Sequence, residues 1–194
     1  MRGARLAAIL LLVATAANAA ERLADPIRAF VDGYDPSNND FLANVPERTV
    51  LLRIRADLDG DGRADLAVSD SSTWGNAGGQ WLLFHAEPDG AYVYWGTLFF
   101  SPGVAASRIV SPSSGELTMY VRTGASRGTL STVRLDAGGI RNVAQAPLDL
   151  EQPADRARYE AIFPRGGTLP VEYCKLPDYR RDPGGCWRPG LGLR

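Results

Sequence analysis

The spacing of apolar residues changes along the chain from a helical period to an alternating one. Between Glu21 and Val31 apolar side chains recur at helical spacing, and Pro26 lies early enough to be tolerated. A polar, turn-rich linker follows from Asp32 to Asn44. From Thr49 the period becomes two, which is typical of a β-strand whose two faces differ. The pattern therefore predicts one N-terminal helix followed by strands.

The first predicted strand has a purely apolar face, made of Val50, Leu52, Ile54 and Ala56, while its other face carries Leu51, Arg53 and Arg55. Turn signals separate the predicted strands, which are 50–56, 66–68, 80–86, 91–100, 117–123, 129–135 and 140–146. Short connections favour an antiparallel arrangement. A last helix is predicted at 154–162. We therefore expect a mainly β fold, an antiparallel β-meander sheet with an N-terminal helix, a short C-terminal helix and a disulfide-pinned tail.

The first 20 residues have the pattern of a secretory signal. Arg2 and Arg5 precede the apolar run Leu6–Val13, and Ala17-Asn18-Ala19 supplies an Ala-x-Ala end. The run is shorter than the about 20 apolar residues that cross a bilayer, so no membrane span is predicted. We expect cleavage after residue 19 or 20. This divides the chain into a signal peptide (1–19), a single β-rich domain (20–165) and an irregular C-terminal tail (166–194), in a protein exported to the periplasm or outside the cell.

The charge and cysteine content indicate which partners and which covalent links to expect. Without Arg2 and Arg5, the 21 basic residues become 19 against 22 acidic ones, and no basic block remains. Nucleic acid is therefore not an expected partner. The two cysteines are Cys174 and Cys186, and in an oxidising compartment such a pair forms a disulfide. A bridge that closes so short a loop contributes roughly 3 kcal/mol to stability.

The clearest candidate chemistry lies in the nine-residue stretch DLDGDGRAD. Its carboxylates are those of Asp57, Asp59, Asp61 and Asp65. Calcium takes six to eight oxygen ligands, and a tightly turned loop aims alternate side chains at one centre. Gly62 allows the sharp turn, the carbonyl of Arg63 points inward, and Asp65 closes the site directly or through a water. The alternative is a metal-free hairpin, because Asp-Gly is also good turn chemistry and nearby arginines neutralise part of the charge.

The order strand, D-x-D-G-D-G-x-x-D, strand resembles the calcium-binding hairpins of the FG-GAP and VCBS repeats, found in integrin α-chains and many secreted bacterial proteins. The resemblance covers Leu51 to Asp70. It implies one Ca²⁺ held by the side chains of Asp57, Asp59, Asp61 and Asp65 and by the carbonyl of Arg63. The loop is EF-hand-like in spacing, but Val68 replaces the bidentate glutamate of an EF-hand. The family repeats this unit around a propeller, whereas this chain contains one copy, which leaves the propeller without support.

The sequence identifies no catalytic residue. His85 is the only histidine, and no G-x-S-x-G elbow accompanies it. We therefore favour a calcium-binding β domain with a structural or binding role in the envelope or outside the cell, and an envelope protein or a glycan as partner. One alternative is a small secreted hydrolase of carbohydrate or cell-wall material, with acids such as Glu87, Asp89 and Glu116. The other is a periplasmic inhibitor or binder that uses the loop 71–79, where Trp74 lies.

Overall fold

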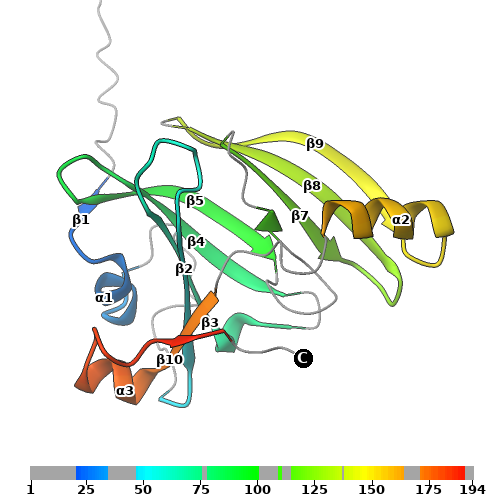
Figure 1. Cartoon of the computed structure of the whole chain (residues 1–194). Coiled ribbons are helices and arrows are strands. Elements are labelled where there is room, and N and C mark those ends of the chain that lie inside the picture. Colours follow the sequence, from blue (N-terminus) through cyan, green and yellow to red (C-terminus); the bar gives the residue numbers. More distant parts are fainter. Residues whose placement is uncertain are drawn as a thin grey trace, which may run out of the picture.

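The computed structural model describes residues 21–34, 47–75, 78–100, 109–110, 115–136, 138–163 and 171–190. These residues form two antiparallel sheets, three α-helices and a short 3-10 helix (Figure 1). The strands are β1 (Arg22–Leu23), β2 (Val50–Ala56), β3 (Asp65–Asp70), β4 (Gly79–Ala86), β5 (Tyr92–Phe100), β6 (Ile109–Val110), β7 (Glu116–Arg122), β8 (Arg127–Asp136), β9 (Gly139–Asp149), β10 (Val171–Lys175) and β11 (Arg188–Pro189). The helices are α1 (Pro26–Val31), η2 (Ser71–Thr73), α2 (Pro153–Ile162) and α3 (Leu176–Arg181).

The larger sheet has seven strands in the order β1-β5-β4-β3-β2-β10-β11. Strands β2 to β5 form a meander in which each strand is antiparallel to the one before it. The smaller sheet has the order β6-β7-β8-β9 and is also an antiparallel meander. The predicted class, a mainly β fold with antiparallel strands and few helices, is confirmed, with two sheets in place of one.

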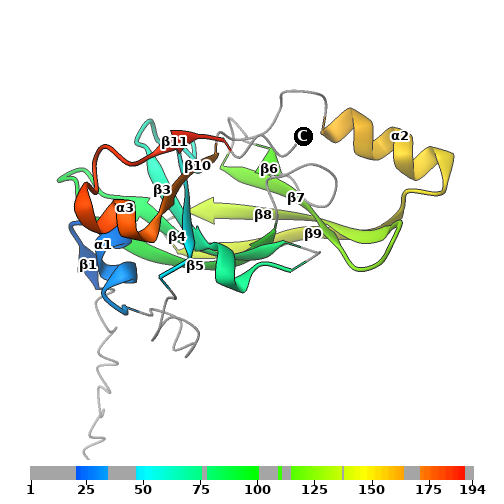
Figure 2. The same cartoon turned by 90° about the horizontal axis from the view of Figure 1, so that it is seen from below.

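The alternation along β2 places its two faces in different cores. Leu52 and Ile54 belong to a cluster that also contains Leu117 and Val133 of the smaller sheet. Leu51, which points the other way, belongs to a second cluster with residues of α1 and α3. The larger sheet is therefore packed on both faces, by the smaller sheet on one side and by α1, α3 and the C-terminal segment on the other (Figure 2).

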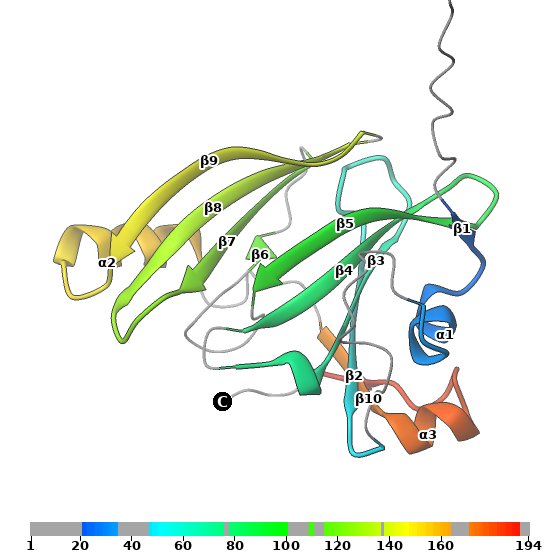
Figure 3. The ribbon, with the colours of Figure 1, turned by 180° about the vertical axis from the view of Figure 1, so that it is seen from behind.

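The smaller sheet extends beyond the larger one and carries α2 at its far end (Figure 3). Tyr120 and Leu130 lie on the face that α2 covers, and they form a third cluster with Leu148 and Phe163. The predicted helix at 154–162 thus coincides with α2 almost to the residue. Strand β9 pairs only with β8 among the described strands, and most of its side chains are exposed.

The C-terminal segment corrects one prediction. We expected residues 166–194 to be an irregular tail, but the described part, 171–190, contains β10, α3 and β11. Strand β10 pairs along its whole length with β2, for example Tyr173 with Leu52. The alternation of Val171 and Tyr173 with Glu172 covers too few residues to mark a strand, and β10 pairs with a strand about 120 positions earlier.

Side-chain contacts also hold the C-terminal segment to β2. Cys174 and Cys186 form the predicted disulfide, with their Cα atoms 5.5 Å apart. Arg53 of β2 pairs with Glu172 at 2.6 Å, and its guanidinium lies 4.0 Å from the ring centroid of Trp187. The segment is therefore an integral part of the larger sheet and of the core beneath it.

The N-terminal helix is shorter than its apolar pattern suggested. Helix α1 starts at Pro26, because Asp25 caps it by accepting a hydrogen bond from the N–H of Arg28. Residues Arg22–Leu23 instead form β1, which pairs with β5. The predicted signal segment, 1–19, lies outside the described residues. Among the helices that the structure describes, none has the length and apolar character needed to cross a membrane.

Candidate metal centre

The aspartate loop connects β2 to β3, at the end of the hairpin where both strands are packed on two faces. Asp57 organises its backbone. One carboxylate oxygen accepts hydrogen bonds from the N–H groups of Gly60 and Asp61, at 2.7 and 3.1 Å, and the other accepts from Gly62 at 2.9 Å. Gly62 has φ of +88°, a conformation that side chains disfavour, as its place in the motif predicted. The sequence therefore folds this stretch into one tight turn around the first carboxylate.

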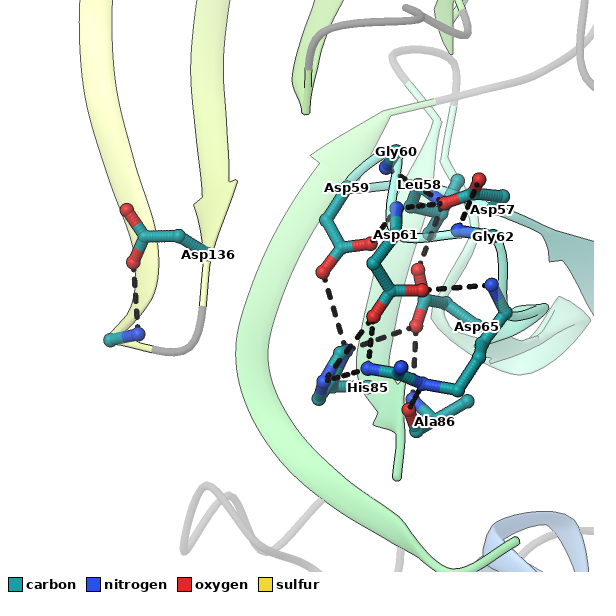
Figure 4. Close-up of polar contacts among 12 residues, drawn as sticks. Asp57, Leu58, Asp59, Gly60, Asp61, Gly62, Asp65, His85, Ala86 and Asp136 are labelled. Carbon is teal, nitrogen blue, oxygen red and sulfur yellow. Dashed lines mark hydrogen bonds and ion pairs between the residues drawn. The ribbon is translucent and has the colours of Figure 1, made fainter. Parts of the chain in front are cut away.

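Three of the predicted ligands converge inside this turn (Figure 4). Asp57, Asp59 and Asp61 each offer one oxygen, and these oxygens lie within 4.8 Å of one another. Such a set can hold a metal ion, and its all-oxygen character suits a hard cation. The guanidinium of Arg63 pairs with Asp61 and so neutralises part of the charge at this group.

Asp65, the fourth predicted carboxylate, turns to the interior. Its side chain is fully buried and accepts hydrogen bonds from the N–H groups of Leu58 and Ala86, at 2.8 and 2.9 Å. Burial raises the pKa of this carboxyl above its ordinary value, the two N–H donors oppose that rise, and the nearby charge of Asp59 adds to it. The structure groups Asp65 with Asp59 but not with Asp57 or Asp61. A direct bond from Asp65 to the loop's ion stays a prediction.

His85 completes a second group, which sequence reasoning missed. Its Nδ1 lies 3.2 Å from Oδ1 of Asp65 and 3.5 Å from Oδ2 of Asp59. Ligand atoms of Asp59, Asp65 and His85 all lie within 4.8 Å of one another, so this group also can hold a metal ion. No local sequence pattern marks this group, because it depends on the pairing of Leu66 with Phe84, a register that brings the neighbouring residues Asp65 and His85 together.

The loop is docked against the smaller sheet. Leu58 is 1% exposed and lies in the core between the two sheets. Gly115, just before β7, has φ of +71°, and a Cβ built there would lie 2.8 Å from the carbonyl oxygen of Asp59. The aspartate loop, through Leu58 and the backbone of Asp59, is therefore part of the contact between the two sheets.

Other candidates from the sequence have different surroundings. Trp74 packs edge-on against Trp81, with centroids 5.9 Å apart, and its indole N–H donates to Ser69 at 2.8 Å. Asp89 forms an ion pair with Arg22, and Glu116 forms one with Arg134. The structure thus anchors Trp74 to the core and gives each of these two acids a basic partner.

Comparison of the chain with known family models, with curated proteins and with solved structures gives no match. The likeness of Leu51–Asp70 to FG-GAP and VCBS hairpins therefore stays a prediction from its residues. The structure provides two groups of side chains able to hold a metal ion at and beside this loop, with Asp59 common to both.

Proposed function

We propose that this chain is an exported β domain that binds one Ca²⁺ in the loop between β2 and β3, and that the ion has a structural role. The observation that carries the proposal is the convergence of Asp57, Asp59 and Asp61 within 4.8 Å. Calcium is preferred because all three ligands are hard oxygens on a loop whose backbone is already turned.

The carboxylates also supply the driving force. Three negative charges at this separation repel one another, and the guanidinium of Arg63 offsets part of this charge. A divalent cation removes the repulsion, with the carbonyl of Arg63 and water completing its coordination. Because the bidentate glutamate of an EF-hand is replaced by Val68, we expect an affinity of about 10⁻⁴–10⁻³ M, the range of extracellular modules.

Bound calcium would act on the contact between the two sheets. The residue after Asp57 is Leu58, which is buried in the inter-sheet core, and the carbonyl oxygen of Asp59 lies close to Gly115, just before β7 of the smaller sheet. An ion that fixes the loop therefore also fixes this contact. The structural role of the ion follows from the position of the loop at this contact and requires no reaction at the metal.

Export is supported by the signal pattern of residues 1–19 and by the disulfide between Cys174 and Cys186. The full chain, expressed in a bacterium, should appear outside the cytoplasm with its new N-terminus at residue 20 or 21, as intact mass will show. Retention of an uncleaved chain in the cytoplasm would contradict export. An envelope protein or a glycan is the partner we expect.

Direct titration tests the calcium proposal. Isothermal titration of the processed protein with CaCl₂ should give one site, and Asp59→Asn should weaken it at least tenfold because the variant removes a central charge. Asp89→Asn is the matched control, since Asp89 also lies on a hairpin turn and pairs with an arginine. An absence of calcium binding, or equal loss in both variants, would contradict the proposal.

A further inference from the structure

The second group, Asp59, Asp65 and His85, differs from the calcium loop in its ligand chemistry. It joins a loop residue, the first residue of β3 and a residue of β4, so its members come from three strands or turns (Figure 4). Nδ1 of His85 faces both carboxylates, at 3.2 Å from Asp65 and 3.5 Å from Asp59. One nitrogen and two oxygens therefore point toward a common centre.

The surrounding structure holds two of these ligands in place. Asp65 is fixed by hydrogen bonds from two backbone N–H groups, one of Leu58 and one of Ala86. The ring of His85 stacks on that of Trp95, with centroids 4.8 Å apart and planes 26° from parallel, and the residue is only 9% exposed. Ligands locked by such outer contacts lose little freedom when an ion binds.

We propose that Asp59, Asp65 and His85 form a second cation site, selective for a divalent transition ion such as Zn²⁺. Calcium takes oxygen ligands, whereas zinc binds imidazole nitrogen together with carboxylate oxygen. Three protein ligands leave a position for water in a tetrahedral zinc site. The site shares only Asp59 with the calcium loop and does not require calcium to bind there.

Zinc would bind Nδ1 of His85, the ring nitrogen that donates its proton to Asp65 in the structure. In the structure His85 Nδ1 lies at hydrogen-bond distance from Asp65, while Nε2 lies 3.4 Å from a guanidinium nitrogen of Arg63, which can only donate. This network places the imidazole proton on Nδ1. Zinc at Nδ1 displaces that proton and leaves the N–H on Nε2, so Nε2 no longer accepts from Arg63, and the Asp61 carboxylate 3.9 Å away is an acceptor on this side.

Because His85 is the only histidine in the chain, its ring nitrogens can be observed without ambiguity. The protein, prepared without a histidine tag and in calcium-free buffer, is titrated with ZnCl₂ while ¹⁵N spectra of the imidazole are recorded. We expect a zinc-dependent shift of Nδ1 that saturates at one ion, with the proton on Nε2. Imidazole signals that do not respond to zinc would overturn the proposal and leave His85 as a hydrogen-bonding partner of Asp65.

A substitution of His85 tests independently whether this residue is a zinc ligand. His85→Gln keeps a polar donor beside Asp65 but removes the zinc ligand, so zinc affinity measured by calorimetry should fall at least tenfold. Calcium affinity of the same variant should stay within about twofold, which shows that the loop is folded. Unchanged zinc affinity in His85→Gln would overturn the proposal. If the unmodified protein binds zinc but does not bind calcium, that result would refute only the calcium assignment.

Discussion

Asp61→Asn is the sharpest perturbation of the calcium loop. The side chain of Asp61 accepts a hydrogen bond from the N–H of Arg63 at 2.8 Å and pairs with the Arg63 guanidinium. Asparagine keeps the shape and one acceptor oxygen but removes the charge. The turn itself depends on Asp57, which receives three backbone N–H groups, so the variant should fold without metal.

The expected effect follows from mass action. With a dissociation constant of about 10⁻⁴–10⁻³ M, about 10 mM calcium stabilises the folded chain by about 1.4–2.7 kcal/mol. A domain of this size gains about 2–4 °C of melting temperature per kcal/mol, so the parent should melt about 3–11 °C higher in calcium than in EDTA. If Asp61→Asn weakens binding to about 10 mM, its gain falls to about 0.4 kcal/mol, or about 1–2 °C.

The assay is a thermal melt followed by circular dichroism, in EDTA and then in calcium or magnesium. Asp89→Asn runs alongside as the control and should keep the full calcium shift. Magnesium should have a smaller effect, because it needs near-ideal octahedral geometry and gives up its water reluctantly. Equal melting of the parent in EDTA and in calcium, or a full shift in Asp61→Asn, would refute this account of the loop.

Three further predictions concern the scaffold. Leu58→Ala should lower the free energy of unfolding by about 2–5 kcal/mol in chemical denaturation, because it empties a fully packed site between the sheets; a loss below about 1 kcal/mol would contradict the docking of the loop. Replacing Cys174 and Cys186 by alanine should cost about 3 kcal/mol, seen as a lower midpoint in the same assay, and reductant should have no further effect on that variant. Burial raises the pKa of the Tyr179 hydroxyl to about 12, above its unfolded value near 10.0, so the neutral form favours the fold and its contribution is lost as pH rises through about 10 to 12. Tyr179→Phe, which removes a buried hydroxyl with no partner among the described residues, should leave stability at pH 7 equal or up to about 1 kcal/mol higher and weaken this alkaline loss; an unchanged alkaline profile would contradict the assignment.

Local patterns in the sequence predicted most of the strands. The alternation from Val50 to Ala56 is visible without any knowledge of neighbours, and the structure places Leu52 and Leu51 on opposite faces as expected. The loop carboxylates were found for the same reason, because Asp57, Asp59 and Asp61 lie within five residues. Features whose partners are close in sequence can be recognised from sequence alone.

Features that depend on distant pairing could not be predicted. The contact of Asp65 with His85 depends on the register of β3 against β4, and a one-residue shift would turn His85 to the opposite face. Strand β10 pairs with β2 across more than 100 residues, and its five residues are too few to form a clear apolar alternation. Both depend on long-range contacts that a single sequence does not encode in a local pattern.

The place of β10 in the sheet has a consequence for how the chain can be assembled. Strand β2, which leads into the aspartate loop, stays an open edge until residues 171–175 pair with it. An open edge with apolar residues on both faces is a template for pairing with other chains. Synthesis delivers this cover more than 100 residues after β2, and the disulfide between Cys174 and Cys186 then holds it in place. A chain that stops short of residue 171 should therefore be aggregation-prone even though its metal loop is complete.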